Sequence, residues 1–355
     1  MFWLNYQSYS LWVNVLIFAG AAGVVWFAGS RISVYADGIS ERTGLGKAFV
    51  GLLFLALATE MPEIGTTMTA AASGNAQLAV GNLFGGIIMQ TAILAAVDLV
   101  IGRGALTYFT PRPVLLLQGT MLALLLGLTL AATTAGELFS LFGVGLWSVL
   151  LFGAYIGSLF LSHRYEGQQR WQPGVPVKEM LDDNELGKRD EPHKKYTDWS
   201  LARLALFFAG GSLLILFAGV TLARVGETLA EQIGLSQTFV GATLLATSTS
   251  LPELSTSISA ARLGNYSMAI SNIFGSNGIM VALIFLTDLF YREGPILQAV
   301  DPAAMFTVAM GIVVTCAYVA GMVERRNQVV LRMGLDSVAV LVLYVGSLAV
   351  LYYIS

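Results

Sequence analysis

The chain has 355 residues, of which 56% are hydrophobic and only 12% are charged. Soluble domains carry about 25% charged residues, so this composition excludes an ordinary soluble protein and indicates an integral membrane protein. The net charge of −3 argues against a nucleic acid partner, and the single cysteine, Cys316, excludes a disulfide framework.

Apolar segments of about 20 residues, the length that spans a bilayer as a helix, recur along the chain. The N-terminal segment lacks both a basic region before its apolar run and a small-residue cleavage site. We therefore interpret it as the first span rather than as a signal peptide. The sequence predicts an all-α integral membrane protein with ten transmembrane helices. These lie at 11–36, 44–72, 76–101, 112–133, 137–162, 198–229, 235–262, 266–290, 300–323 and 331–354.

One long polar stretch, residues 163–197, separates five predicted spans in residues 1–162 from five in residues 198–355. It is too short and too polar to bury a core, so we interpret it as a solvated linker. Lysine and arginine gather in this linker and in the loops on its side of the membrane, whereas the other side carries only Arg224 and Arg292. The positive-inside rule therefore predicts a multi-pass protein of the cell membrane, with a cytoplasmic linker and both termini outside.

The two halves repeat each other at a constant offset, which is 190 residues between Pro62 and Pro252. The matched positions are Phe27-Ala28-Gly29 with Phe217-Ala218-Gly219, Phe49-Val50-Gly51 with Phe239-Val240-Gly241, Pro62-Glu63 with Pro252-Glu253, Gly74-Asn75 with Gly264-Asn265, Asn82 with Asn272, and Asp98 with Asp288. Because five is an odd number, the halves enter the membrane in opposite senses. Two inverted-topology five-helix repeats with broken helices are typical of secondary transporters, whose binding site lies near the membrane midplane.

Each half places a proline and a glutamate inside a predicted span. A proline lacks the N–H that would continue the helix, so Pro62 and Pro252 free the carbonyls near Ala58 and Ser248. Such carbonyls are tolerated at membrane depth where they line a cavity or bind an ion. Further oxygens come from Glu63, Glu253, Thr59, Thr249 and Ser250. All these donors are oxygens, which are the ligands of hard cations such as Ca²⁺, and the C-terminal ends of half-helices also favour cations.

The two motifs, with the "GNLFGG" and "SNIFGSNG" segments that follow them, resemble the α-repeats of the cation/Ca²⁺ exchanger superfamily. The usual pattern there is G-T-S-x-P-E, then G-N-x-x-G-S and an Asn or Asp one turn later. The resemblance covers nearly the whole chain apart from the linker. It implies that the second and third helices of each repeat form the ion-binding core, and that the long first helix slides as a gate.

Carried over residue by residue, the resemblance implies that Glu63 and Glu253 bind Ca²⁺. It implies hydroxyl ligands at Thr59 and Thr249, backbone carbonyl ligands at Ala56 and Ala246, and a further ligand at Ser276. This sequence departs from the family pattern at four positions. Glu60 replaces the first-repeat serine, Gly86 replaces the serine of G-S, and the later Asn or Asp positions are Gln90 and Met280.

Several residues allow a second interpretation. Glu60 either joins the site or faces a side crevice. Asn82 and Asn272 either bind the ion or pack helices together, and Ser276 and Gln90 leave the same choice. Asp98 and Asp288 lie near helix ends, where solvation at the membrane interface is the expected role. Buried acids within membrane spans otherwise indicate function.

The sequence therefore predicts an antiporter that exchanges Ca²⁺, or a similar cation, for Na⁺ or H⁺ by alternating access. Its partners are inorganic cations and the lipid bilayer, and no cofactor is expected. The alternatives are a cation channel and a Na⁺/H⁺-type exchanger without Ca²⁺ transport. An intramembrane hydrolase is excluded because the two histidines, His163 and His193, lie in or beside the linker. Glu60 is expected to provide a third carboxylate where Met280 cannot, and so to tune which ion returns.

Overall fold

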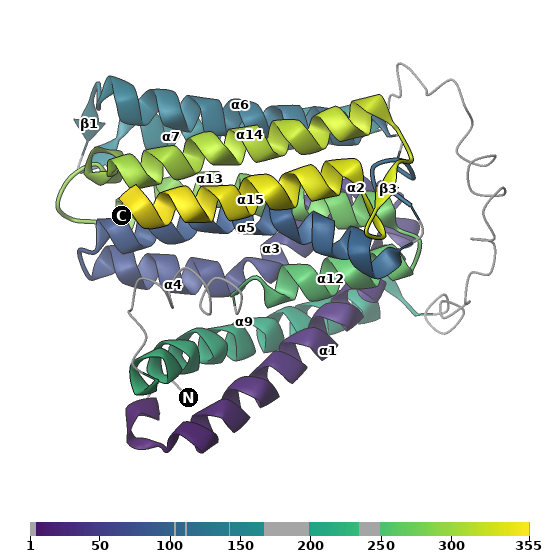
Figure 1. Cartoon of the computed structure of the whole chain (residues 1–355), viewed down its shortest axis with the longest axis horizontal. Helices are drawn as coiled ribbons and strands as arrows, with labels where there is room; N and C mark the ends of the chain where they lie inside the picture. Colours follow the sequence, from purple (N-terminus) through teal and green to yellow (C-terminus); the bar gives the residue numbers. More distant parts are fainter. Residues whose placement is uncertain are drawn as a thin grey trace.

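The computed structural model describes residues 5–102, 104–110, 112–141, 143–166, 199–233 and 249–354. Helices make up nearly all of this part of the chain (Figure 1). Eight of the described helices are long and apolar enough to cross a membrane. They are α1 (Leu11–Thr43), α5 (Ala76–Ile101), α6 (Pro113–Ala135), α7 (Leu146–Glu166), α9 (Leu201–Gln232), α13 (Tyr266–Phe290), α14 (Pro302–Glu324) and α15 (Leu335–Ile354).

A further span is bent. Its two segments, Lys47–Thr59 and Met61–Ala72, meet at an angle of 52° around Glu60. Pro62 lies directly after the bend, and its missing N–H removes a hydrogen bond that would have continued the helix. The elements of this span are α2 (Lys47–Val50), the π-helical turn η2 (Gly51–Leu55), α3 (Ala56–Thr59) and α4 (Met61–Ala72).

The corresponding span of the second half is described from Thr249 onward and contains α12 (Leu251–Arg262). The predicted span 235–262 therefore lies partly outside the described residues, as does most of the linker at 163–197. The predicted all-helical membrane fold is confirmed.

Among the eight long helices, α13 and α5 are the most buried, and they lie at the centre of the bundle. The buried share of their most apolar stretch is 78% for α13 and 61% for α5, against 17% for α1 and for α15. Helices α1 and α9 pack against each other along one side of the molecule (Figure 1). Helix α1 also packs on α12, and α9 on α4. Each long first helix thus covers the proline-bearing helix of the opposite half.

Two glycines bring these helices into close contact. A Cβ atom on Gly29 of α1 would lie only 1.9 Å from the hydroxyl of Ser255 in α12. A Cβ on Gly219 of α9 would lie 2.3 Å from Cγ of Pro62 in α4. Gly29 and Gly219 are matched by the repeat, so a glycine at the same position allows a close approach in each half, although the facing residues differ.

Two short hairpins sit at equivalent places in the halves. Strands β1 (Ser140–Leu141) and β2 (Val144–Gly145) precede α7, and strands β3 (Val329–Val330) and β4 (Met333–Gly334) precede α15. The predicted spans 137–162 and 331–354 began too early because apolar hairpin residues extend the hydropathic signal. Helix α1 continues to Thr43, beyond the predicted end at residue 36.

Asp98 of α5 and Asp288 of α13 hold these hairpins. Both are buried, with exposed fractions of 0% and 2%, so the predicted solvated role at the membrane interface is wrong. For Asp98 the backbone donors are Leu106 at 2.8 Å and Gly334 at 2.6 Å; for Asp288 they are Ile296 at 2.7 Å and Gly145 at 2.7 Å. Gly334 belongs to the second half and Gly145 to the first. Each aspartate therefore binds the hairpin of the other half, and we call this pair of contacts the crossed clasps.

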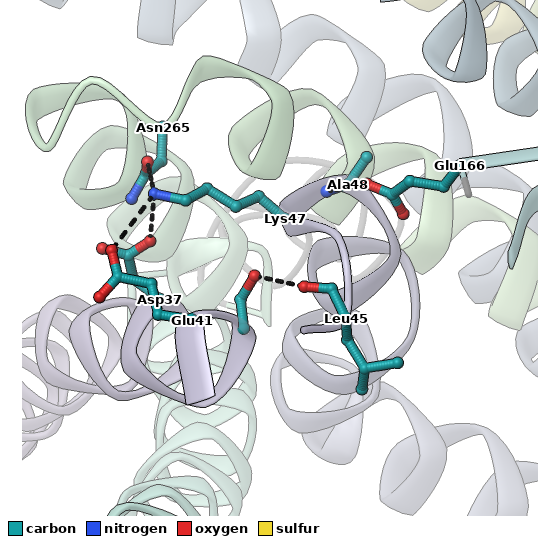
Figure 2. A network of polar contacts seen from close by, with 8 residues as sticks. Asp37, Glu41, Leu45, Lys47, Ala48, Glu166 and Asn265 are labelled. Atoms are coloured by element: carbon teal, nitrogen blue, oxygen red, sulfur yellow. Dashed lines mark hydrogen bonds and ion pairs between the residues drawn. The ribbon is translucent and has the colours of Figure 1, made fainter. Parts of the chain in front are cut away.

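A polar network joins the Thr43 end of α1 to the core (Figure 2). Lys47 Nζ lies 2.7 Å from Asp37 Oδ1 and donates a 2.7 Å hydrogen bond to Asn265 Oδ1. Glu41 Oε1 lies 4.0 Å from the same nitrogen. Lys47 thus connects α1 with the first turn of the bent span and with the start of α13.

The carboxylate of Glu166, at the end of α7, lies nearby (Figure 2). It accepts hydrogen bonds from the backbone N–H groups of Ala48 at 3.2 Å and Phe49 at 2.9 Å. These N–H groups belong to the first turn of α2 and have no partner within that helix, so Glu166 fixes where the bent span begins.

Candidate cation-binding site

The bend in the first half brings two helix ends together at Glu60. This residue follows the last residue of α3 and precedes the first residue of α4. Glu63 lies in the first turn of α4, where the partial positive charge of the helix N-terminus stabilises a carboxylate. The C-terminal end of α3, with its partial negative charge, favours a cation at the same place.

The second half repeats this arrangement as far as it is described. Ser250 occupies the N-cap position of α12 without a side-chain capping hydrogen bond, and Glu253 lies in the first turn of this helix. Thr249 and Ser250 are both buried, each with 3% of its surface exposed. Ala246, a predicted carbonyl ligand, lies outside the described residues, as does Ser248.

Glu63 and Glu253 are the centre of the candidate site. They are 2% and 0% exposed, and none of their carboxylate oxygens has a hydrogen-bond partner among the described residues. The two carboxylates lie close enough for their charges to repel each other. Thr249 faces Glu63, and Thr59 faces Glu253, so each glutamate is approached by a hydroxyl of the opposite half.

Glu60 points into the same region rather than into a side crevice. It is fully buried, and its charge interacts with those of both Glu63 and Glu253. Gln90 Nε2 donates a 2.5 Å hydrogen bond to Glu60 Oε1, and the Ser276 hydroxyl also faces this carboxylate. The hydroxyls of Ser276 and Thr59 lie 3.4 Å apart. The structure thus brings Glu60, Gln90 and Ser276 together.

The carbonyl of Ala56 is engaged within the protein. It accepts hydrogen bonds from the backbone N–H of Glu60 at 2.9 Å and from the Thr59 hydroxyl at 3.0 Å. A carbonyl oxygen has two lone pairs, so both are in use. Binding of a cation by Ala56 would require the Thr59 hydroxyl to turn away.

Asn82 and Asn272 use their amide nitrogens to pack helices. Asn82 Nδ2 donates to Thr67 at 3.0 Å, and Asn272 Nδ2 donates to Thr256 at 3.0 Å and to Ser257 at 3.2 Å. The carbonyl oxygen of Asn272 is buried without a partner in the described part of the chain. Helix packing and ion binding are therefore compatible at Asn272, because each role uses a different atom.

Sequence reasoning missed the role of Thr66 and Thr256. Each lies one turn after a proline-glutamate pair, and each hydroxyl donates to the carbonyls of that pair. These threonines thus connect the asparagines to the glutamate-bearing turns. The hydrogen bond from Asn82 Nδ2 to the Thr66 hydroxyl is weak, at 3.4 Å, whereas that from Asn272 Nδ2 to the Thr256 hydroxyl is 3.0 Å. The available signal was the repeat itself, since Thr66 and Thr256 are matched at the 190-residue offset.

The donor set is mixed rather than purely acidic. Across the described ranges, no group of three His, Cys, Asp or Glu side chains is arranged to hold a metal ion alone. Hydroxyl and amide oxygens would have to complete a coordination shell, as Ca²⁺, with six to eight oxygen ligands, requires. No ion pair with a basic side chain neutralises the three glutamates in the part of the chain that is described.

Comparison with known families gives two matches within this chain. The family described as "Sodium/calcium exchanger protein" matches residues 13–162 and again residues 203–353. The two matched segments correspond to the two halves related by the 190-residue offset.

Individual proteins are similar over most of the chain. The sodium/calcium exchanger MaX1 of Methanosarcina acetivorans is 27% identical, covering 90% of this chain and 93% of its own. The inner membrane protein YrbG of Escherichia coli is 26% identical, covering 86% and 89%. A solved structure of the sodium-calcium exchanger NCX_Mj superposes with a TM-score of 0.69 at 16% identity, covering 96% and 99%. This structural likeness concerns the fold.

Proposed function

From the premise that the chain belongs to the sodium/calcium exchanger protein family of membrane cation antiporters, we propose that it exchanges Ca²⁺, or a similar divalent cation, for Na⁺ or H⁺. The exchange proceeds by alternating access between the two sides of the membrane. The similarity to MaX1, whose name states sodium/calcium exchange, supports this choice of ions.

The observation that carries the proposal is the pair of buried, unpartnered glutamates, Glu63 and Glu253. An uncompensated ion buried in a protein costs several kcal/mol. Two carboxylates are neutralised by one divalent cation, so Ca²⁺ removes the cost of both. When Ca²⁺ leaves, the repulsion between the glutamates returns, and other cations must replace it before the carrier moves back. This requirement is the physical basis of obligatory exchange.

The remaining oxygens complete the site in this proposal. Thr59, Thr249 and Ser250 contribute hydroxyls, and Asn272 contributes its unpartnered carbonyl, with Asn82 in the matched position. Glu60, Gln90 and Ser276 form a lateral extension of the site on the α3–α4 side. The backbone carbonyl of Ala56 serves as a further ligand when its own hydrogen bonds are released, and that of Ala246 is the matched ligand of the second half.

Helices α1 and α9 are the proposed moving gate. They pack mainly against each other, and they contact the core through α12 and α4, the two helices that carry the glutamates. The contacts at Gly29 and Gly219 lack side chains on the gate helix. Smooth contact surfaces of this kind allow one helix to slide over another without a bulky side chain having to change place.

The orientation in the membrane is part of the proposal: residues 1–162 and 198–355 form the two inverted repeats, and the linker is cytoplasmic. Lysine and arginine asymmetry supports this orientation. In a Cys316→Ala background, an impermeant thiol reagent should label Ser8→Cys on intact cells and Asp190→Cys only after permeabilisation. Labelling of Asp190→Cys on intact cells would overturn the orientation.

The decisive experiment is ⁴⁵Ca²⁺ uptake into proteoliposomes containing the purified protein. Uptake accelerated by Na⁺ inside the vesicles, or by an imposed pH gradient, would support exchange and identify the counter-ion. Ca²⁺ flux that no counter-ion stimulates would indicate a channel instead. Na⁺-dependent proton movement without Ca²⁺ flux would indicate a Na⁺/H⁺-type exchanger.

A further inference from the structure

Three positions of the candidate site differ between the two halves, whereas the threonine, proline and glutamate of each motif are identical. The differing pairs at the 190-residue offset are Glu60 with Ser250, Gln90 with Met280, and Ser276 with Gly86. The identical pairs are Thr59 with Thr249, Pro62 with Pro252, and Glu63 with Glu253. The differences therefore form two matched sets of three residues, one on each side of the central glutamates.

The first set is rich in oxygen. Glu60, Gln90 and Ser276 are each fully buried and come from three different elements: the α3–α4 bend, α5 and α13. Glu60 Oε2 and Gln90 Oε1 are acceptor atoms with no hydrogen-bond partner among the described residues. Two buried, unpartnered acceptors, one of them a carboxylate oxygen, favour a bound cation, because a buried polar atom without a partner is destabilising.

The second set is almost without oxygen. Met280 is fully buried, and the end of its side chain lies over Gly86. A Cβ atom on Gly86 would lie 2.5 Å from Met280 Cε and 3.0 Å from Met280 Sδ. A serine at position 86, matching Ser276, would have to displace the end of Met280. The thioether is at most a weak acceptor, so this set offers a cation only the hydroxyl of Ser250.

We propose, on the basis of the function proposed above, that Met280 is a specificity-determining residue that closes one of two symmetry-related cation positions beside the central glutamates. The open position is formed by Glu60, Gln90 and Ser276. The closed position is its counterpart at Ser250, where Met280 and Gly86 fit together. The counter-ion is therefore bound on one side of the glutamate pair only.

This arrangement follows from volume and charge together. The glycine at position 86 provides space, and the methionine at position 280 fills it. Glu60, on the opposite side, supplies the carboxylate that position 280 lacks. A carboxylate at position 280 would restore an oxygen and a charge to the closed position. The site would then have one more place for a monovalent cation.

The test is a count of bound Na⁺ by ²²Na⁺ equilibrium binding to the purified full-length protein, with ⁴⁵Ca²⁺ binding measured on the same samples. Met280→Asp is expected to bind one more Na⁺ per protein than the wild type. Met280→Leu, the matched apolar control, is expected to bind the wild-type number. Met280→Asn supplies an oxygen without a charge and replaces Met280→Asp should that variant fail to fold; it too is expected to gain a Na⁺.

Each outcome bears on one proposal. Equal Na⁺ counts in folded Met280→Asp and Met280→Leu would overturn closure by Met280, as would the absence of Na⁺ binding in every variant. A wild-type protein that binds no Ca²⁺ would contradict the proposed exchange function instead, whatever the Na⁺ counts.

Discussion

In the first half of the chain, Asn75 caps its own helix by accepting a hydrogen bond from Leu78, whereas its counterpart Asn265 accepts one from Lys47. The backbone is similar at both places, but the partners differ. Lys47 corresponds to Gln237, so the second half has a neutral side chain at the position of this cation. The halves thus share a framework and differ in charge.

The same division holds elsewhere in the molecule. Pairs that keep their identity hold helices or hairpins in place: Asn82 with Asn272, Thr66 with Thr256, Gly29 with Gly219, and Asp98 with Asp288. The differing pairs Glu60 with Ser250, Gln90 with Met280 and Ser276 with Gly86 belong to the candidate site, and Lys47, which corresponds to Gln237, lies near the Thr43 end of α1. The comparison indicates that the repeat preserves the helical framework and the central glutamate pair, while the proposed counter-ion position is built from residues that differ between the halves.

The largest expected effect comes from removing a charge at Glu63 or Glu253, a pair that is identical in the two halves. Glu63→Gln and Glu253→Gln should each lower Ca²⁺ transport by about 100-fold or more, because one carboxylate cannot neutralise a buried divalent cation. Equal losses in both variants would support equivalent roles for the halves. The measurement is ⁴⁵Ca²⁺ uptake, with the exposed surface residue Glu324→Gln as the control. Wild-type transport by both variants would contradict the site.

The crossed clasps give the next effect. Asp98→Asn and Asp288→Asn should each reduce stability by about 2 kcal/mol, since hydrogen bonds to a charged acceptor are worth about 1.5–3 kcal/mol. Thermal unfolding in detergent measures this loss. Similar shifts for both variants are expected from the symmetry, and Asp301→Asn, at the start of α14, is a comparison at a partly exposed helix cap. No shift in either clasp variant would mean that the hairpins are held by other contacts.

Glu60→Ser makes position 60 identical to its counterpart in the second half, Ser250. We expect Ca²⁺ binding to be retained while the Na⁺ concentration for half-maximal exchange changes by about tenfold, the lower range for loss of a metal-site residue. Uptake of ⁴⁵Ca²⁺ against a series of Na⁺ concentrations tests this. An unaltered Na⁺ profile would show that Glu60 does not determine the counter-ion.

The smallest effect is expected at the network of Lys47. The Lys47 side chain is 31% exposed and that of Asp37 8%, so Lys47→Gln should cost about 1 kcal/mol or less. Arg326→Gln removes a more exposed ion pair and should cost nothing measurable. Thermal unfolding of both variants makes the comparison. A loss at Lys47 no greater than at Arg326 would mean that the network does not stabilise the junction of α1 with the core.

Composition and apolar segment length allowed the sequence to predict the membrane fold, and the matched prolines Pro62 and Pro252 predicted a broken helix in each half. The sequence also singled out Glu60 and Gln90, as departures from the family pattern, and Ser276, as a match to it; the structure places these three residues together. The sequence could not predict that Met280 lies over Gly86, since that contact depends on how α5 and α13 face each other. Nor could it predict the clasps, because Phe139, Leu141, Leu331 and Met333 are apolar and were included in the predicted spans 137–162 and 331–354.

The crossed clasps have a consequence for how the protein is made. Asp98 is synthesised 236 residues before Gly334, and Gly145 is synthesised 143 residues before Asp288. The Asp98 carboxylate and the Gly145 N–H therefore lack these partners until the second half of the chain has been synthesised. The first half therefore cannot form all of its contacts alone. The hydrogen bond to Asp98, in the third predicted span, forms only after the β3–β4 hairpin has been synthesised. If the two halves were produced as separate chains, they would have to associate within the bilayer before Asp98 and Asp288 could accept these hydrogen bonds.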